Sequence, residues 1–158
     1  MNVTKVMTSD VVTCAPSDSL NRAAQIMWEN DCGFLPVVED GCRLVGVVTD
    51  RDICMGAYTQ GRPLSDIAVD NVMARQIQTC KAEDEIASVE RLMRDNKLRR
   101  VPVVDESSEL LGVVTLGDLA RCSQAGPLQK ALGGLAISKT LASICEPRSP
   151  QQTSAAAQ

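Results

Sequence analysis

One pattern in this sequence places chemically useful side chains at a fixed spacing, and it occurs twice. Gly-Val-Val-Thr-x-x-Asp runs from Gly46 to Asp52 and again from Gly112 to Asp118. The glycine lets another group approach the backbone closely. A threonine at a helix start offers a hydroxyl beside unpaired amides, where the helix dipole favours an anion. The aspartate has two oxygens that suit the 2′- and 3′-hydroxyls of a ribose, so the pattern is a candidate nucleotide contact.

The same residues also fit a purely structural role. Thr-x-x-Asp at a helix start is close to a capping box, in which the hydroxyl and the acid satisfy backbone amides and no ligand is involved. Repetition does not decide between the two interpretations, because duplicated helices need duplicated caps. Thr49 with Asp52, and Thr115 with Asp118, are therefore open to both.

The pattern belongs to a longer internal duplication. A shift of 66 positions aligns Val6–Cys54 (copy one) with Val72–Ala120 (copy two) without a gap, and 16 of the 49 aligned residues are identical. Each copy is predicted to contain a strand, a helix, two strands and a helix. The predicted strands are Val11–Cys14, Phe34–Val38 and Leu44–Val48 in copy one, and Ile77–Cys80, Val101–Val104 and Leu110–Val114 in copy two.

The helices of each copy are marked by their starts and by their apolar spacing. Asp18 and Asp84 are expected to cap the first helix of each copy, which has apolar residues on one face. The second helices are expected to begin at Thr49 and Thr115. The predicted fold class is therefore α/β.

A copy of about 50 residues has too little core to be stable alone. The two copies are therefore expected to pack sheet against sheet about a pseudo-two-fold axis, with helices outside. The predicted division is residues 1–61 for the first unit with its N-terminal segment and 62–123 for the second. Residues 124–158 are expected to form a tail, with a short helix near 135–145 followed by disorder.

Composition narrows the function classes. The 158 residues include no histidine, which excludes Ser-His-Asp and Cys-His relays and histidine metal sites. The net charge of −4 opposes binding to duplex nucleic acid. No apolar run is long enough to span a membrane, and no secretory signal is present. Seven cysteines without a Cys-x-x-Cys pair fit reduced thiols in the cytoplasm.

The duplicated motifs resemble a tandem pair of CBS domains, the arrangement called a Bateman module. In copy one the matching residues are Val6-Met7, Val11-Val12-Thr13, Pro36-Val37-Val38 and Gly46–Ile53; in copy two they are Val72-Met73, Pro102-Val103-Val104 and Gly112–Leu119. The resemblance covers residues 2–123. It implies two β-α-β-β-α units in each chain, and a second chain that often completes a disc.

The resemblance also implies two clefts that in many members bind AMP, ADP, ATP or S-adenosylmethionine. No cofactor is required. Asp52 and Asp118 would hold the ribose, and Thr49 and Thr115 would face phosphate. The base pockets would be lined by residues of the first strands and by those at the start of the Pro-Val-Val runs. The predicted lining residues are Val12, Thr13, Phe34, Leu35 and Pro36, and Gln78, Thr79, Arg100, Val101 and Pro102.

The two copies differ in charge near these positions. Copy one has Arg51 beside Asp52, and copy two has Arg99 and Arg100 before its second strand. Arginine binds phosphate bidentately. If each pocket combines both copies, Thr49, Arg51, Asp52 and Arg100 converge on one nucleotide, while Thr115, Asp118 and Phe34 form a less basic pocket. One site is therefore expected to bind more strongly than the other.

The sequence thus predicts a cytoplasmic regulatory module rather than an enzyme. It would bind a small-molecule nucleotide and act as a homodimer or through an unidentified protein partner. Three alternatives stay open: a ligand-free scaffold in which Thr-x-x-Asp only caps helices, a nucleotide hydrolase using Asp50 and Asp52, and a single-strand nucleic-acid binder using Lys97–Arg100.

Overall fold

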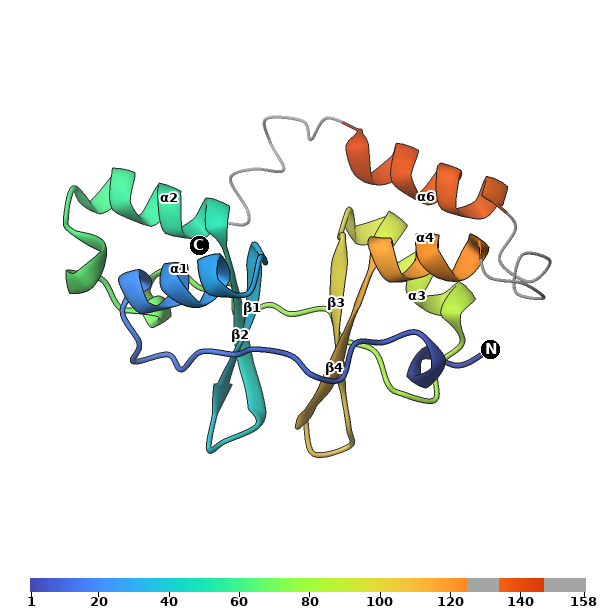
Figure 1. The fold of residues 1–158 in the computed structure, drawn as a ribbon, viewed down its shortest axis with the longest axis horizontal. Coiled ribbons are helices and arrows are strands. Elements are labelled where there is room, and N and C mark those ends of the chain that lie inside the picture. The colour runs from blue at the N-terminus through green and yellow to red at the C-terminus, as the bar shows by residue number, and fades with distance from the viewer. Residues whose placement is uncertain (125–133, 147–158) are drawn as a thin grey trace. The chain divides into compact units, whose positions relative to one another are not determined.

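The computed structural model describes residues 1–124 and 134–146, and it has the predicted mixed α/β architecture (Figure 1). Copy one contains α1 (Leu20–Glu29), β1 (Phe34–Glu39), β2 (Arg43–Thr49) and α2 (Asp50–Gln60). Copy two contains α3 (Ile86–Asn96), β3 (Arg100–Val104), β4 (Leu110–Thr115) and α4 (Leu116–Gln124). Three short 3-10 helices and a last helix complete the description: η1 (Val3–Lys5), η2 (Leu64–Asp66), η3 (Val69–Asn71) and α6 (Gly134–Cys145).

The chain forms two compact units, and each takes a segment from outside its own copy. The copy-one unit consists of Asp10–Ile77 with Glu106–Leu110. The copy-two unit consists of Met1–Ser9, Gln78–Asp105 and the described residues from Leu111 onward. The segment that precedes copy one therefore packs with copy two, and the segment that precedes copy two packs with copy one. Val3 and Val69, which are 66 positions apart, are both fully buried in these places.

Each unit is built on a two-stranded antiparallel hairpin. In the copy-one unit Phe34 pairs with Thr49 at one end of the hairpin. Asp40 and Gly41, at the other end, both have positive φ (51° and 90°), as a type I′ turn requires. We call the segment before each copy, which packs with the other unit, a borrowed segment. Each borrowed segment extends a hairpin by one antiparallel bridge, Val47 to Ala74 and Thr8 to Val113.

The repeated glycine of the motif makes room for the borrowed segment. A Cβ atom on Gly46 would lie 2.5 Å from Met73 Sδ, and one on Gly112 would lie 2.6 Å from the carbonyl oxygen of Thr8. The close approach predicted from these glycines is thus made by the chain itself. The glycines give no support to a ligand at that point.

The prediction of a strand at the start of each copy is wrong. Val11–Cys14 and Ile77–Cys80 each make a single parallel bridge, Cys14 to Val37 and Cys80 to Val103. The cause lies in the neighbouring strands. The next hydrogen bond of a parallel ladder would have to come from the backbone nitrogen of Pro36 or Pro102, which carries no hydrogen.

The predicted aspartate caps of the first helices are also wrong. Ser19 caps α1, since its side chain accepts from the backbone N–H of Arg22 at 3.2 Å. Asp18 instead accepts from the N–H of Ala15 at 2.8 Å, and Asp84 accepts from that of Lys81 at 2.8 Å. Both aspartates therefore stabilise the turn before the helix, as short carboxylates commonly do.

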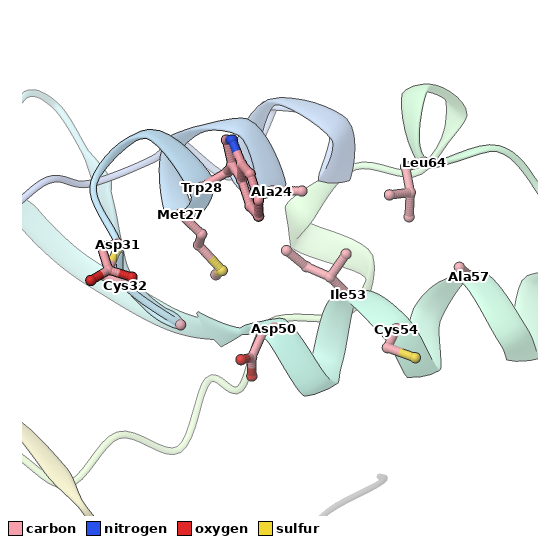
Figure 2. A pocket seen from close by; sticks show the side chains of 11 residues that line it. Ala24, Met27, Trp28, Asp31, Cys32, Asp50, Ile53, Cys54, Ala57 and Leu64 are labelled. Atoms are coloured by element: carbon pink, nitrogen blue, oxygen red, sulfur yellow. The ribbon is translucent and has the colours of Figure 1, made fainter.

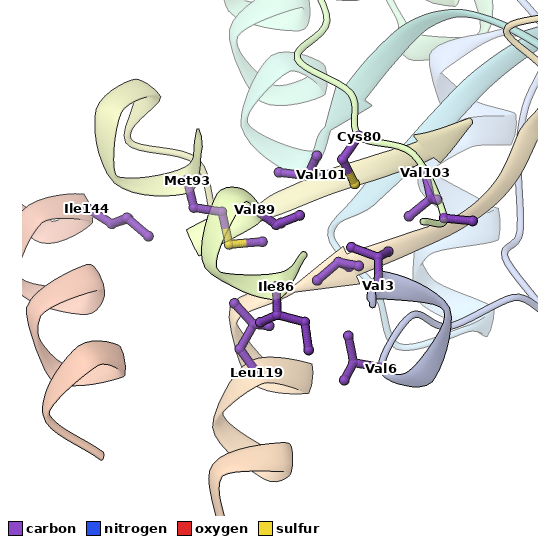
Figure 3. Close-up of a cluster of buried hydrophobic side chains, with 12 residues drawn as sticks. Val3, Val6, Cys80, Ile86, Val89, Met93, Val101, Val103, Leu119 and Ile144 are labelled. Atoms are coloured by element: carbon purple, nitrogen blue, oxygen red, sulfur yellow. The ribbon is translucent and has the colours of Figure 1, made fainter. Parts of the chain in front are cut away.

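The cores are aliphatic, as the composition requires. The copy-one core gathers Leu20, Met27, Leu35, Val48 and Ile53 with residues of the borrowed segment. Figure 3 shows the copy-two core, in which Val3 and Val6 lie among side chains of α3, β3 and α4. Ile144 of α6 belongs to the same cluster. Helix α6 lies where the sequence predicts a short helix near 135–145.

Candidate functional site

The Thr49–Asp52 motif forms a closed capping box at the start of α2. The N–H and the hydroxyl of Thr49 donate to Asp52 Oδ2 at 2.9 and 2.7 Å. The N–H of Asp52 donates back to Thr49 Oγ1 at 3.2 Å. Asp52 is half-buried, and among the described residues its second oxygen, Oδ1, accepts no hydrogen bond. The carboxylate therefore caps the helix and keeps one oxygen for another donor.

The Thr115–Asp118 motif repeats the cap but uses the second oxygen. The N–H and hydroxyl of Thr115 donate to Asp118 Oδ2 at 2.8 and 2.7 Å, and the N–H of Asp118 donates to Thr115 Oγ1 at 3.1 Å. Asp118 is only 5% exposed. Its Oδ1 accepts from the guanidinium of Arg121, one turn further along α4. Copy one has Met55 at this position, so Asp52 has no such cation.

The other predicted residues of copy one lie in two places. Phe34, half-buried, is opposite Thr49 in the hairpin, and Arg51 is exposed on the first turn of α2. The side chains of Leu35 and Pro36 are buried. Val12 and Thr13 are half-buried, and Thr13 lines a separate hollow of about 520 Å³ beside the β1–β2 turn.

The predicted residues of copy two divide in a similar way. Arg99 and Arg100 are exposed, and the carbonyl of Arg99 accepts from the N–H of Leu116 at 2.9 Å. Arg99 therefore lies beside Leu116, the first residue of α4, which directly follows Thr115 in the sequence. Gln78 and Thr79 are exposed. Val101 and Pro102 are buried, and Val101 belongs to the copy-two core. The sixteen predicted residues thus split evenly between the two units.

Sequence reasoning missed a groove on the helical face of the copy-one unit. It measures about 590 Å³ and lies between α1 and α2 (Figure 2). Its lining residues are Ala24, Met27, Trp28, Asp31, Cys32, Gly33, Asp50, Ile53, Cys54, Ala57 and Leu64. Trp28 is 88% exposed. An exposed tryptophan on an otherwise amphipathic helix is the signal in the sequence that points to this face.

The buried cysteines have no nucleophilic character. Burial raises the pKa of the Cys14 thiol to about 12, and the carboxylate of Asp18 adds to the effect. Burial likewise raises the pKa of Cys80 to about 12, together with Asp84. Both thiols stay protonated near neutral pH, and a protonated thiol is unreactive because the thiolate is the nucleophile. They pack as small apolar residues, as their matching positions in the two copies predict.

Within residues 1–124 and 134–146, no three His, Cys, Asp or Glu side chains gather closely enough to hold a metal ion. In the same residues, no helix combines the length and the apolar character needed to cross a bilayer.

Comparison with protein families matches most of the chain. The model of the CBS domain matches residues 3–56 and again 68–125. A CBS domain-containing protein of Bacillus subtilis, YhcV, is 36% identical over 119 residues, which are 75% of this chain and 83% of that protein. The two matched ranges contain the two copies of the duplication.

Solved structures show the same fold. The structure of CBSX2 in complex with AMP has a TM-score of 0.70 and 28% identity, covering 78% of this chain and 96% of that one. The CBS domain pair of protein MJ0100, in complex with 5′-methylthioadenosine and S-adenosyl-L-methionine, has a TM-score of 0.68 and 26% identity. It covers 77% of this chain and 94% of the MJ0100 chain.

Proposed function

This chain belongs to the CBS-domain family, and from that premise we propose that it is a regulatory module that binds an adenosine-containing nucleotide. The observation that carries the proposal is the second oxygen of Asp52. One oxygen closes the helix cap, while Oδ1 accepts no hydrogen bond from the described residues. A ribose hydroxyl can donate to it without breaking the cap. The AMP and S-adenosylmethionine complexes of CBSX2 and MJ0100 support this class of ligand.

The two copies would bind ribose unequally. Asp118 already accepts from Arg121 at the oxygen that a ribose would need. Arg121 is 74% exposed and the Asp118 side chain only 6%, and a ribose has to compete with this ion pair for Oδ1. We therefore assign the stronger ribose contact to Asp52 and a severalfold weaker one to Asp118. The exposed cations Arg51, Arg99 and Arg100 are the candidates for phosphate contacts.

A ligand-free scaffold is the second candidate, and the closed capping boxes favour it. Both aspartates have a structural role that explains their repetition without a nucleotide. In that case replacing Asp52 lowers only the stability of the protein.

A thermal-shift panel tests the proposal first. It contains AMP, ADP, ATP and S-adenosylmethionine, with 2′-deoxy-AMP as the control for the ribose contact. A ligand at about 100 times its Kd adds about 2.7 kcal/mol of stability, which is readily seen as a rise in Tm. The expected result is a rise with a ribose nucleotide and a smaller one with the deoxy compound. No rise with any compound, in protein free of co-purified nucleotide, would favour the scaffold.

The Asp52→Glu variant distinguishes the role of Asp52 in capping the helix from its proposed role in binding the ribose. Glutamate also closes a capping box, so the variant should unfold at nearly the wild-type Tm. Its carboxylate is displaced by one methylene, so ribose binding should fall at least about tenfold in calorimetry, since a hydrogen bond to a charged group is worth about 1.5–3 kcal/mol. Arg121→Met, which copies Met55, should strengthen the second site. Unchanged affinity in both variants would remove these aspartates from the site.

The proposed module has no catalytic role of its own and signals through self-association or a partner protein. A homodimer stays a prediction, which light scattering of the purified protein tests. We also propose a cytoplasmic location, because all seven cysteines are free thiols, as in a reducing compartment.

A further inference from the structure

The hollow beside the β1–β2 turn of the copy-one unit, which we call the turn hollow, measures about 520 Å³. Of the predicted nucleotide-site residues, Thr13 alone lines it. Asp52 follows Thr49, which lies at the other end of the hairpin from the turn. The turn hollow is therefore separate from the proposed ribose contact. Its lining residues include Ala15, Asp18, Glu39 and Asp40.

Copy two has the same backbone arrangement at the equivalent place. The N–H of Ala15 donates to Asp18 Oδ2 at 2.8 Å. The N–H of Lys81 donates to Asp84 Oδ2, also at 2.8 Å, and the duplication aligns these two pairs. One parallel bridge precedes this turn in each copy. The two turns therefore present the same backbone to the space beside them.

The side chain at one aligned position differs, and in copy two that side chain crosses the equivalent space. Lys81 is half-buried, and its ammonium donates to the backbone carbonyl of Asp105. The residue aligned with Asp105 is Glu39, which lines the turn hollow. Copy one has Ala15 where copy two has Lys81. The turn hollow is thus the space that a lysine side chain and its ammonium take in the other copy.

The turn hollow carries negative charge that an ammonium group can meet. Asp18, Glu39 and Asp40 line it, and Arg43 forms ion pairs with the last two at 2.7 and 3.2 Å. Three carboxylates less one guanidinium leave a net charge of −2 at this place. Asp18 is half-buried, and among the described residues its Oδ1 accepts no hydrogen bond. A ligand with two positive charges therefore matches the turn hollow.

We propose that the turn hollow binds a small alkyl diamine. One ammonium takes the place of the Lys81 ammonium and donates to the backbone carbonyl of Glu39. The alkyl chain passes Ala15 as the lysine methylenes pass the equivalent point in copy two, and the second ammonium lies among the carboxylates of Asp18 and Asp40. Alkylamines are protonated near neutral pH, as lysine is. The proposal goes beyond nucleotide binding and does not depend on it.

Titration with 1,4-diaminobutane, followed by amide chemical shifts at low and matched ionic strength, tests the proposal. The expected result is a saturable change in the amides of residues 13–18 and 38–41. Butylamine has one ammonium and should bind about two- to fivefold more weakly, as the loss of one exposed ion pair allows. The uncharged 1,4-butanediol should not bind. No saturable change, the same change with the diol, or equal affinity for butylamine would overturn the diamine site.

Two occupant variants exchange the side chains of the two copies. Ala15→Lys should supply the ammonium from the chain itself, so it should raise the Tm and abolish binding of the diamine. Lys81→Ala should lower the Tm, and butylamine should restore part of the loss whereas butanol should not. Diamine binding that survives Ala15→Lys at the wild-type affinity would overturn the proposal.

A matched pair of charge variants completes the test. Asp40 and Asp31 both have positive φ (51° and 48°), which asparagine adopts readily, but Asp31 lines the α1–α2 groove instead. Asp40→Asn should weaken diamine binding about two- to fivefold, and Asp31→Asn should leave it unchanged. An equal effect of both variants would contradict the site. Because these measurements use no nucleotide, their failure leaves the nucleotide proposal standing.

Discussion

Among single residues, Glu90 is a carboxylate whose surroundings oppose its charge. It is 5% exposed, and within the described chain its Oε1 has no hydrogen-bond partner. Burial raises the pKa of this carboxyl, and the nearby Arg94 only partly offsets the effect. Copy one has Ala24 at the same position, where it lines the open groove. The charged residue thus occurs on the helical face that α6 covers.

Replacing Glu90 with Gln should stabilise the protein near neutral pH. A carboxyl with a raised folded-state pKa binds more protons when folded, so wild-type stability falls as pH rises from the unfolded pKa through the folded one. The variant lacks this fall, so at a pH above the folded-state pKa its free energy of unfolding should exceed that of the wild type by about 1 kcal/mol. Urea unfolding at a pH of about 4.5 and about 7.5 measures both effects. Equal stability of the two proteins at the higher pH would mean that Glu90 is solvated.

At the scale of elements, α6 is the one α-helix of the described residues that has no counterpart in the duplication. It presents Ile137, Thr140 and Ile144, spaced i, i+3 and i+7, to the copy-two unit. Thr140 is fully buried, while Leu141 on the same helix is 46% exposed. The helix therefore packs by one face, and that face accounts for its position.

Ile144→Ala should cost about 2 kcal/mol or more, because it leaves a cavity in the copy-two core. Leu141→Ala removes a similar volume from the exposed face and should cost less than about 0.5 kcal/mol. Urea unfolding of both variants gives the comparison. Equal costs would contradict the docking of α6 by its Ile137–Ile144 face.

The sequence predicted most elements because their signals are local. Apolar periodicity and the hairpin turns were enough for four helices and two hairpins, and the Thr-x-x-Asp pattern located both caps. What it could not predict depended on distant partners. Pro36 limits a predicted strand that lies more than twenty residues earlier. The space beside Gly46 is filled by Met73, and that beside Gly112 by Thr8. Arg121 lies only three residues after Asp118, but the sequence alone does not show that the two side chains pair.

At the scale of the whole molecule, the two copies exchange their opening segments. Val3 and Val6 complete the copy-two core, and Ile67 and Val69 complete the copy-one core. A boundary drawn between the repeats, such as the predicted one at residue 61, separates each core from part of its own residues. The domain boundaries themselves stay a prediction.

A matched pair of variants shows this exchange in solution. Val3→Ala and Val69→Ala remove the same group from equivalent buried positions and should each cost about 2 kcal/mol. Hydrogen exchange should speed up in α3 and β3 for Val3→Ala, and in α1 and β1 for Val69→Ala. Loss of protection in the same peptides for both variants would contradict the exchange.

The position of the borrowed segment Met1–Ser9 also determines the order in which the two cores can form during synthesis on the ribosome. Met1–Ser9 is made before every residue of copy two against which it packs. The segment from Ile67 to Met73, by contrast, emerges soon after the copy-one core that it closes. The copy-one core can therefore form while synthesis continues, whereas Val3 and Val6 have no core to pack against until α3 and β3 have emerged. During that interval the nascent chain exposes the side chains of Val3 and Val6, which the finished protein buries.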